Sequence, residues 1–233
     1  MNLACIIPFY NEGSRVLSVL NQVSKIKLIT QIICVDDGSL DNSSNLIKEN
    51  FKDVELIKMD KNSGKAAAVL LGAKKAQSNY LLLLDADLQN LNPKEIENAI
   101  KSARNNATID MIILRRINDA IIPRMFRSDV LVSGERILKK ADLLKVFKKD
   151  PTSYQLEVAI NKYMLDNHKK VVTIANSATN YHRINKYGIL MGIKNEIKMD
   201  ISILQYTGLL GLLKQMLFLP EKNLNNLLAR QLS

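Results

Sequence analysis

The chain has 233 residues, of which 47% are hydrophobic and 24% are charged. It can therefore bury a core of its own, as one domain or as a domain with an appendage. This composition excludes a disordered, a collagenous or a disulfide-rich protein. The formal net charge of +10 at pH 7 suggests nucleic acid, an anionic membrane surface or phosphorylated substrates as partners, with solvated lysine faces as the plainer explanation.

Sequence motifs narrow these partner classes. The chain has no zinc-finger spacing and no basic region followed by heptads. Aromatic residues make up only 5% of the chain, which leaves few platforms for base stacking, so no nucleic acid partner is predicted. Cys5 and Cys34 lie inside apolar runs and are expected to be quiet core thiols. A strand pattern begins at Leu3 with no secretory leader before it, so we expect a cytoplasmic protein.

Strand and helix patterns alternate through the first half of the chain. Continuous apolar runs predict the strands, and apolar residues at helical spacing predict the helices. In chain order we expect a strand at Leu3–Ile7, a helix at Val16–Val23, a strand at Gln31–Val35, a helix around Leu46 and Ile47 capped by Asp41, a strand at Val54–Met59, a helix at Lys65–Ala76, a strand at Tyr80–Leu84, a helix at Lys94–Ala103 begun by Pro93, and a strand at Met111–Leu114. This order predicts an α/β fold whose mostly parallel central sheet is flanked by helices.

The alternation weakens after Arg115. The expected elements are a loop with a short helix over Ile117–Val132, an amphipathic helix at Ser153–Asp166, a strand at Val171–Ala175, an irregular polar stretch at Asn176–Gly188 and a helix with a broad apolar face at Ile189–Leu219. We therefore divide the chain into a main domain at residues 1–188 and a C-terminal helical segment at residues 189–233.

Three polar, acidic turns follow strands of the predicted sheet. They are Pro8–Glu12, Asp36–Ser39 and Asp85–Gln89. In parallel sheets the ligand binds outside the carboxyl ends of the strands. The three turns therefore predict one ligand site at that edge, in a protein that is basic as a whole.

The turn Asp85-Ala86-Asp87-Leu88-Gln89 carries the sharpest chemical signal. In an extended segment its two carboxylates and the Gln89 amide would lie on one face. These oxygens suit Mg²⁺ or Mn²⁺, and such a cation would neutralise a departing diphosphate as a Lewis acid. The plainer alternative is a strand-to-helix turn in which one aspartate is an N-cap.

Four motifs occur together over about residues 3–90. They are Ile6-Ile7-Pro8-Phe9-Tyr10-Asn11-Glu12, Val35-Asp36-Asp37-Gly38-Ser39, Asn62-Ser63-Gly64-Lys65 with Ala68 and Gly72, and Leu84-Asp85-Ala86-Asp87-Leu88-Gln89. In order and spacing they resemble family-2 glycosyltransferases of the GT-A fold. The Asp-Ala-Asp-Leu-Gln form looks most like the dolichol- or polyprenyl-phosphate mannosyl and glucosyl transferase branch.

The resemblance implies a GT-A catalytic domain at residues 1–188. It also implies an inverting, metal-dependent transfer of a hexose from a GDP- or UDP-sugar to a polyprenyl or dolichyl phosphate. Carried over residue by residue, it places Pro8, Tyr10 and Glu12 in the nucleoside pocket, and it gives Asp37 a hydrogen bond from a base N–H, with Val35 beside it. Lys65 and Ala86 would contact the donor. Asp85, Asp87 and Gln89 would bind the metal and the donor diphosphate, with Asp87 as a catalytic residue.

The resemblance continues more weakly beyond residue 110. Arg115 matches a catalytic arginine after the fifth strand, and Arg183 with Lys186 resembles a late basic pair that closes over the donor phosphates. The run Ser133-Gly134-Glu135-Arg136 looks like a Ser-Gly-Phe-Arg element, with Glu135 in place of the aromatic residue. We expect Arg127, Ser133 and Arg136 to bind the acceptor, because arginine suits phosphate oxygens. The alternative is that these arginines are surface residues paired with nearby acids.

Glu157 is the candidate catalytic base, on the predicted helix at Ser153–Asp166. A hydroxyl acceptor, on a saccharide or another cell-envelope molecule, would need this base. A phosphate acceptor is already anionic and would not, in which case Glu157 would be a helix-surface acid or an ion-pair partner.

The C-terminal segment Ile201–Leu219 is apolar but includes Gln205, Lys214 and Gln215, at the short limit for a membrane span. We expect an amphipathic helix that lies on the inner face of the cell membrane, packs on the main domain or forms a homodimer.

Two further functions remain as alternatives. A sugar-phosphate nucleotidyltransferase shares the broad architecture, but the glycine-rich N-terminal loop of that class is missing. A basic module that binds membranes or nucleic acid without catalysis is the non-enzymatic alternative.

Overall fold

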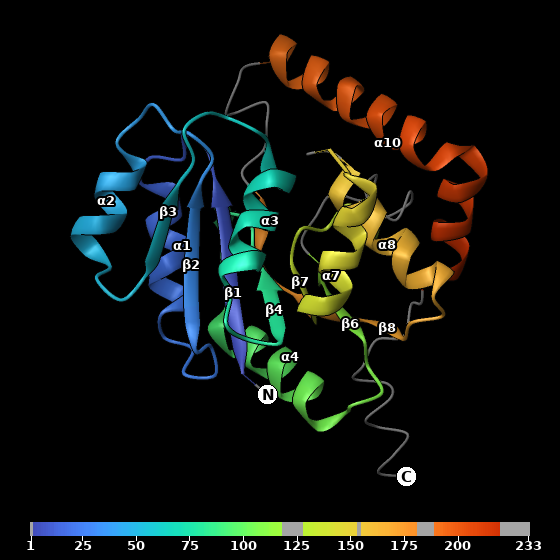
Figure 1. Cartoon of the computed structure of the whole chain (residues 1–233), viewed down its shortest axis with the longest axis horizontal. Helices are drawn as coiled ribbons and strands as arrows, with labels where there is room; N and C mark the ends of the chain where they lie inside the picture. Colours follow the sequence, from blue (N-terminus) through green and yellow to red (C-terminus); the bar gives the residue numbers. More distant parts are fainter. Residues whose placement is uncertain (1, 118–127, 153–154, 181–188, 220–233) are drawn as a thin grey trace.

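The computed structural model describes residues 2–117, 128–152, 155–180 and 189–219 (Figure 1). Its centre is a seven-stranded sheet in the order β3-β2-β1-β4-β7-β6-β8. The strands are β1 Leu3–Phe9, β2 Gln31–Asp36, β3 Glu55–Lys58, β4 Tyr80–Leu83, β6 Met111–Arg116, β7 Arg136–Lys139 and β8 Val171–Asn176, while β5 Leu88–Gln89 and β9 Thr179–Asn180 form a small separate sheet. Because β7 alone runs antiparallel to its two neighbours, the sheet is mostly parallel, as predicted.

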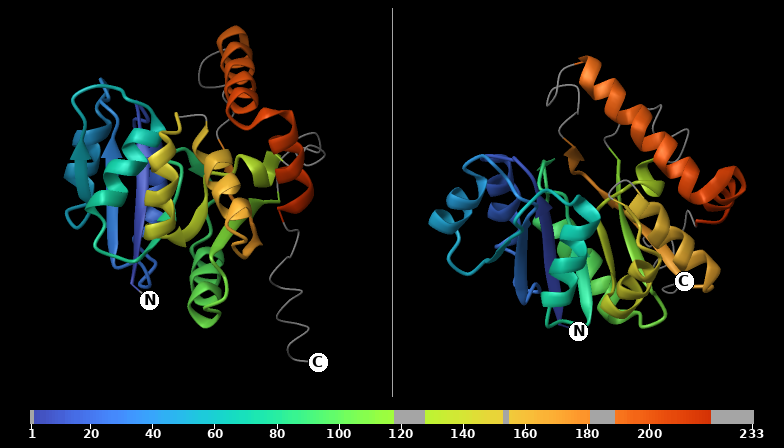
Figure 2. Two further views of the ribbon diagram at one scale, coloured as in Figure 1. Left: turned by 45° about the vertical axis from the view of Figure 1, so that its right-hand side comes forward. Right: turned by 45° about the horizontal axis from the view of Figure 1, so that its top comes forward.

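Helices cover both faces of the sheet (Figures 1 and 2). They are α1 Arg15–Val23, α2 Ser43–Asn50, α3 Lys65–Lys75, α4 Pro93–Asn105, α6 Ser128–Leu131, α7 Lys140–Val146, α8 Leu156–Asp166 and α10 Ile189–Phe218, with a short 3-10 helix, η1, at Phe147–Lys149. Residues of α1, α2 and α4 pack on one face, and residues of α3, α6, α7 and α8 pack on the other.

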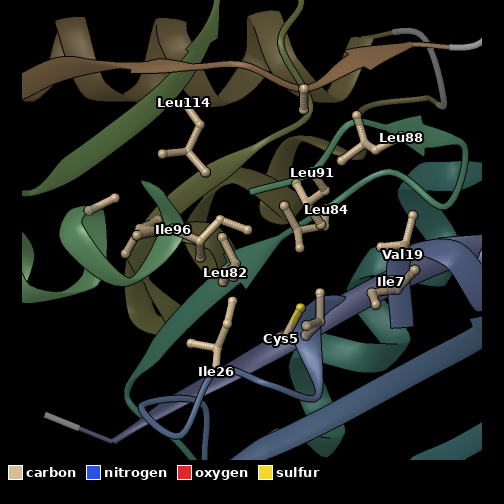
Figure 3. Packing of buried hydrophobic residues seen from close by; sticks show 14 of the residues in the cluster. Cys5, Ile7, Val19, Ile26, Leu82, Leu84, Leu88, Leu91, Ile96 and Leu114 are labelled. Carbon is tan, nitrogen blue, oxygen red and sulfur yellow. The ribbon is translucent and has the colours of Figure 1, made fainter. Parts of the chain in front are cut away.

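Alternate residues of β1 supply these two cores. Cys5 and Ile7 pack toward α1, where Val19 meets them (Figure 3). Ala4 and Ile6 belong to the opposite core, toward α3. Because successive side chains of a strand point to opposite faces, a strand apolar at every position must be covered twice. Every residue of β1 is buried, which confirms the doubly covered sheet.

The three acidic turns meet at one edge of this sheet. Strand β1 lies between β2 and β4 and is parallel to both. The turns that follow these three strands therefore leave the sheet side by side, as the parallel order predicted.

Strand β7 of the main sheet and the small β5–β9 sheet were not among the expected elements. No strand was predicted at β7, yet its four residues fill the gap between β4 and β6. The run Arg-Ile-Leu-Lys is too short and too charged at its ends to show a strand pattern. The pairing of β5 with β9, which joins the segment after Asp87 to residues 179–180, was not predicted either, because two-residue strands leave no periodic signal.

Helix α10 lies outside the two core layers and packs on α8 (Figures 1 and 2). Gln215 donates a hydrogen bond to the Val158 carbonyl at 3.2 Å, and Gln155 donates one to the Ser202 hydroxyl at 3.1 Å. At Gly208 the backbone leaves helical geometry, with φ 65° and ψ 165°. The predicted long helix is therefore two helical halves joined at this glycine.

Glycine is required at position 38, in the turn after β2. Its φ is +74°, and a Cβ atom there would lie 2.6 Å from the Lys61 carbonyl carbon. Gly13 has a similar φ of +55°, but its nearest atom to such a Cβ is Asp41 Oδ2 at 3.9 Å. At both positions a residue with a side chain would be strained by the positive φ, but only at Gly38 would its Cβ also overlap neighbouring atoms.

We expect Gly38→Ala to lower the free energy of unfolding by about 3 kcal/mol, because left-handed strain and overlap with the 61–62 backbone add up. Gly13→Ala, which has the strain without the overlap, should cost about 1 kcal/mol. Urea denaturation of both variants measures the difference, and equal losses would contradict it.

Candidate functional site

A pocket lies at the carboxyl ends of β1 and β4. Its walls come from β1, α3, the end of β4, the connection between β6 and β7, and the first turns of α8. The lining residues are Pro8, Lys65, Val69, Leu83, Leu84, Asp85, Gly134, Arg136, Leu156, Glu157 and Ile160. The fold thus brings residues from both halves of the chain to the edge at which the sequence predicted a site.

The ammonium group of Lys65 connects two carboxylates in this pocket. Its Nζ lies 2.6 Å from Asp85 Oδ1 and 2.8 Å from Glu157 Oε1. The three side chains are between 11% and 29% exposed, so solvent screens the ion pairs only in part. Burial alone would lower the pKa of Lys65, but the two carboxylates outweigh it and raise that pKa. The lysine is therefore charged and holds together two anions that would otherwise repel each other.

Gly134 makes room for this contact. A Cβ atom at this position would lie 2.6 Å from Asp85 Oδ1 and 2.7 Å from Lys65 Nζ. Since the backbone itself forms this wall of the pocket, any other residue would push the lysine or the aspartate away. Gly134 was not predicted as a site residue. Its only signal in the sequence is the glycine of the run Ser133-Gly134-Glu135-Arg136.

The predicted metal ligands follow β4. Asp85 and Asp87 are half-buried and Gln89 is exposed, while Ala86 and Leu88 between them are buried. The segment is not fully extended as expected, because Ala86 and Asp87 form a turn before β5. The alternating burial is nevertheless the one expected. Ala86 is only 4% exposed, so its side chain packs in the core. Its predicted contact with the donor stays a prediction and would have to come from its backbone.

Carboxylate and amide oxygens fit a hard divalent cation such as Mg²⁺ or Mn²⁺. Among the residues that the structure describes, no three His, Cys, Asp or Glu side chains are grouped as a metal cluster. We still expect a cation held here to take its remaining ligands from substrate or water.

The predicted nucleoside pocket lies at the turns after β1 and β2. Pro8 is buried and lines the pocket, and Tyr10 is half-buried. Glu12 is 7% exposed and accepts a hydrogen bond from Arg15 Nε at 2.8 Å. Val35 is fully buried in the core that includes α3. Its side chain faces the core, and the predicted placement of Val35 beside the nucleoside stays a prediction.

Asp37 joins the turn after β2 to the start of α3. Its two carboxylate oxygens accept hydrogen bonds from the backbone N–H groups of Ser63 and Gly64, at 2.7 and 2.8 Å. Burial raises the pKa of Asp37, although these two N–H groups act against the shift. The neighbouring Asp36 is fully buried and accepts from the Ser39 N–H and the Ser44 hydroxyl. Asp37 thus fixes the backbone just before Lys65, while Asp36 fixes the turn after β2 and the start of α2. A contact of Asp37 with a base stays a prediction.

Glu135 faces the interior of the protein. It is fully buried and accepts hydrogen bonds from Arg116 at 3.0 Å and from the Ser133 hydroxyl at 2.7 Å. Burial raises the pKa of Glu135, while the charge of Arg116 lowers it. The Ser133 side chain is also fully buried, and its hydroxyl lies between Glu135 and the Leu114 carbonyl. Its predicted acceptor contact stays a prediction. Glu135, which stands where the resembled Ser-Gly-Phe-Arg element has an aromatic residue, is thus accommodated in the interior by its ion pair with Arg116.

The predicted arginines have different environments. Arg136 is fully buried among backbone carbonyls, so its guanidinium is not a surface group awaiting an acceptor. Arg115 is half-buried near the end of β6. The predictions for Arg127, Arg183 and Lys186 lie outside the described residues.

Lys65→Met should lower the free energy of unfolding by about 3 kcal/mol, because Asp85 and Glu157 lose their shared cation while remaining largely buried. The matched control is Lys101→Met. It breaks an exposed pair with Glu97 at 3.9 Å and should cost at most about 0.5 kcal/mol. Urea denaturation compares the two, and a small loss for Lys65→Met would show that the bridge contributes little.

Comparison with known families and proteins shows what this chain is similar to. The model of the family described as glycosyl transferase family 2 matches residues 4–168. An uncharacterized protein of Methanocaldococcus jannaschii is 36% identical over 107 residues, which cover 42% of this chain and 45% of that protein. The undecaprenyl-phosphate 4-deoxy-4-formamido-L-arabinose transferase of Proteus mirabilis is 32% identical over 124 residues, which cover 50% of this chain and 37% of the transferase. The matches thus span less than half the length of either relative.

Solved structures agree at the level of the fold. Glucosyl-3-phosphoglycerate synthase from Mycobacterium tuberculosis, crystallised with Mn²⁺, UDP and phosphoglyceric acid, aligns with a TM-score of 0.71 at 14% identity, covering 95% of this chain and 80% of that one. Residues 1–349 of S. aureus TarS align with a TM-score of 0.63 at 17% identity, covering 92% of this chain and 71% of that fragment. These likenesses establish the GT-A fold predicted from the motifs. Since the family match extends over more than half of its length, the chain belongs to glycosyl transferase family 2.

Proposed function

We propose that the protein transfers a hexose from a GDP- or UDP-sugar to a polyprenyl or dolichyl phosphate, with inversion at the anomeric carbon. The observation that carries the proposal is the pocket at the end of β4, where Asp85 is presented beside Lys65 and Glu157. The names of relatives such as the undecaprenyl-phosphate transferase of Proteus mirabilis support the acceptor. The UDP and Mn²⁺ in the neighbouring synthase structure support the donor and the cation.

Each part of the donor has candidate partners in this chain. Pro8, Tyr10, Glu12 and Asp37 would surround the nucleoside, and Lys65 with the backbone of Ala86 would face the diphosphate. Asp85, Asp87 and Gln89 would hold Mg²⁺ or Mn²⁺, because their oxygens fit a hard cation. Such a cation, when bound, supplies Lewis-acid stabilisation of the departing diphosphate.

The transfer itself exchanges one carbon–oxygen bond for another. An oxygen of the acceptor phosphate forms a bond to the anomeric carbon, and the bond from that carbon to the donor diphosphate breaks. The nucleoside diphosphate leaves with the electron pair. Lys65 contributes positive charge beside the departing group, which is the kind of electrostatic stabilisation that lowers such barriers most. We propose Asp87 and Arg115 as the further catalytic residues of this step.

The acceptor class depends on Glu157. One of its oxygens is 2.8 Å from Lys65 Nζ, so the lysine already engages this side of the carboxylate. This arrangement favours a phosphate acceptor, which needs no base. The position of Glu157 inside the pocket keeps a hydroxyl acceptor as the second candidate, with Glu157 as its base.

The apolar surface of α10 supports a peripheral membrane contact at the cytoplasmic face. Leu209, Leu210, Leu217 and Phe218 are between 64% and 82% exposed. In the described part of the chain, the segment Lys198–Phe218 is long and apolar enough to cross a membrane. The break at Gly208 divides this apolar segment into residues 198–207 and 209–218, each about 15 Å long. Two short pieces suit a bilayer surface better than a span of about 30 Å.

The net charge of +10 would add attraction to anionic lipids. We propose residues 189–233 as the membrane-contacting segment and residues 1–188 as the catalytic domain. A homodimer through the same apolar surface is the other way to cover it.

Asp87→Ala should reduce metal-dependent turnover of the donor by at least about 10²–10³-fold, the usual effect of removing one electrostatic partner of the transition state. Turnover is measured with UDP- and GDP-sugars, Mn²⁺ and a short polyprenyl phosphate. Asp53→Ala, at an exposed turn, is the control and should be unchanged. Near-normal turnover by Asp87→Ala would refute the assignment.

Replacing Leu210 and Leu217 by Asp should weaken sedimentation with phosphatidylglycerol vesicles at least tenfold, because about 1.5–3 kcal/mol of apolar burial is lost for each leucine. Leu40→Asp is the control, since Leu40 is 89% exposed but lies on the turn before α2. Unchanged vesicle binding together with a change of mass from dimer to monomer would identify the surface as a dimer interface instead.

A further inference from the structure

Arg136 has the largest side chain among the fully buried residues of the described chain. Burial lowers its pKa to about 10, although Glu157, Glu135 and Asp85 act in the opposite direction. The group therefore remains charged at neutral pH. A buried charge is costly unless all of its donors are used, and the partners of Arg136 show what the guanidinium holds in place.

The guanidinium connects two segments that form one side of the pocket, residues 131–133 and the first turns of α8. Its Nε donates to the Ser133 carbonyl at 2.7 Å, and its Nη2 donates to the Leu131 carbonyl at 3.2 Å. Its Nη1 donates to Asn161 Oδ1 at 2.5 Å and to the Glu157 carbonyl at 3.3 Å. The first two bonds hold the turn before β7, and the last two hold the first turns of α8.

Asn161 completes this connection from the helix. While its Oδ1 accepts from Arg136, its Nδ2 donates to the Leu131 carbonyl at 2.9 Å. Asn161 is fully buried, so neither bond competes with water. The arginine and the asparagine together fasten α8 to the end of α6 and to the residue that precedes Gly134.

Both segments held by Arg136 end at the Lys65 bridge. Gly134 is the wall against Lys65 and Asp85, and the Glu157 carboxylate is the second partner of the lysine. A shift of α8 or of the turn at Gly134 by a few tenths of an ångström would therefore change the distances around Lys65 Nζ. The planar guanidinium of arginine, whose donors have a rigid geometry, holds neighbouring segments in place better than the flexible ammonium of lysine would.

We propose that Arg136 is a positioning residue of the active site, which sets the place of Glu157 and Gly134 around Lys65 and Asp85 through Asn161 and the backbone of residues 131–133. The proposal rests on the proposed function for its kinetic consequences. It replaces the expectation, from the sequence alone, that Arg136 binds the acceptor.

The test removes one partner of the guanidinium and leaves the arginine in place, because replacing Arg136 itself endangers folding. Asn161→Ala deletes that partner, and Asn161→Asp restores an acceptor oxygen for Nη1. Tyr163→Phe is the matched control. It removes a 3.0 Å hydrogen bond to Asp142 from the same helix, away from the pocket.

Two measurements are made on the full-length protein. The first is kcat and KM for UDP-glucose or GDP-mannose with Mn²⁺, whichever the wild type turns over. The second is amide hydrogen exchange of residues 156–160 without ligand. We expect Asn161→Ala to lower kcat about tenfold with the donor KM within twofold, and to speed exchange at residues 156–160 about fivefold. Asn161→Asp should recover most of both, and Tyr163→Phe should change neither.

The outcomes separate this proposal from the proposed function. If the wild type turns over no nucleotide sugar, the proposed function fails, and exchange alone decides whether Arg136 holds the start of α8. Unchanged exchange at residues 156–160 in Asn161→Ala would overturn the positioning role. Equal losses of kcat in Asn161→Ala and Tyr163→Phe, or no recovery in Asn161→Asp, would also overturn it, because a general loss of stability would then explain the effect.

Discussion

The contact on which the site depends is the Lys65 ammonium between Asp85 and Glu157. The two carboxylates come from positions 20 and 92 residues further along the chain, at the end of β4 and in the first turn of α8. Two partly buried anions at this spacing repel each other unless a cation lies between them. The elements around the pocket serve this contact: Asp37 fixes the backbone before α3, Gly134 leaves space, and Arg136 holds α8.

This cluster is balanced in charge. Lys65, Arg116 and Arg136 lie with Asp85, Glu135 and Glu157. Glu135 shows why balance matters here, since an acid in place of an aromatic residue would be costly in the core without Arg116 and the Ser133 hydroxyl. A donor diphosphate would enter beside an existing network of charges, in which the interior of the protein has already oriented the polar groups.

Much of the first half could be predicted from the sequence, because its signals are local. Strands β1, β2 and β4 are continuous apolar runs, and the acidic turns follow them directly, so the edge that carries the site was predictable. The contact of Lys65 with Glu157 was not, since nothing in a sequence reports which helix lies opposite Asp85. Strand β7 has four residues with charged ends, and the burial of Arg136 and Ser133 follows from its position between β4 and β6. Pairings of this long range depend on tertiary packing and leave no periodic trace.

The antiparallel strand β7 also has a consequence for how the protein forms. Strands β3, β2, β1 and β4 all come from the first 83 residues and pair among themselves, so a nascent chain can assemble this half of the sheet while the remainder is still being synthesised. β7 must then add to β4 across a separation of more than 50 residues, and such distant pairings close slowly. The turns after β1, β2 and β4 can thus form before the pocket does. Only when β7 docks and α8 follows it does Lys65 gain its second carboxylate, so a chain truncated before residue 136 would carry the family's motifs without a completed site.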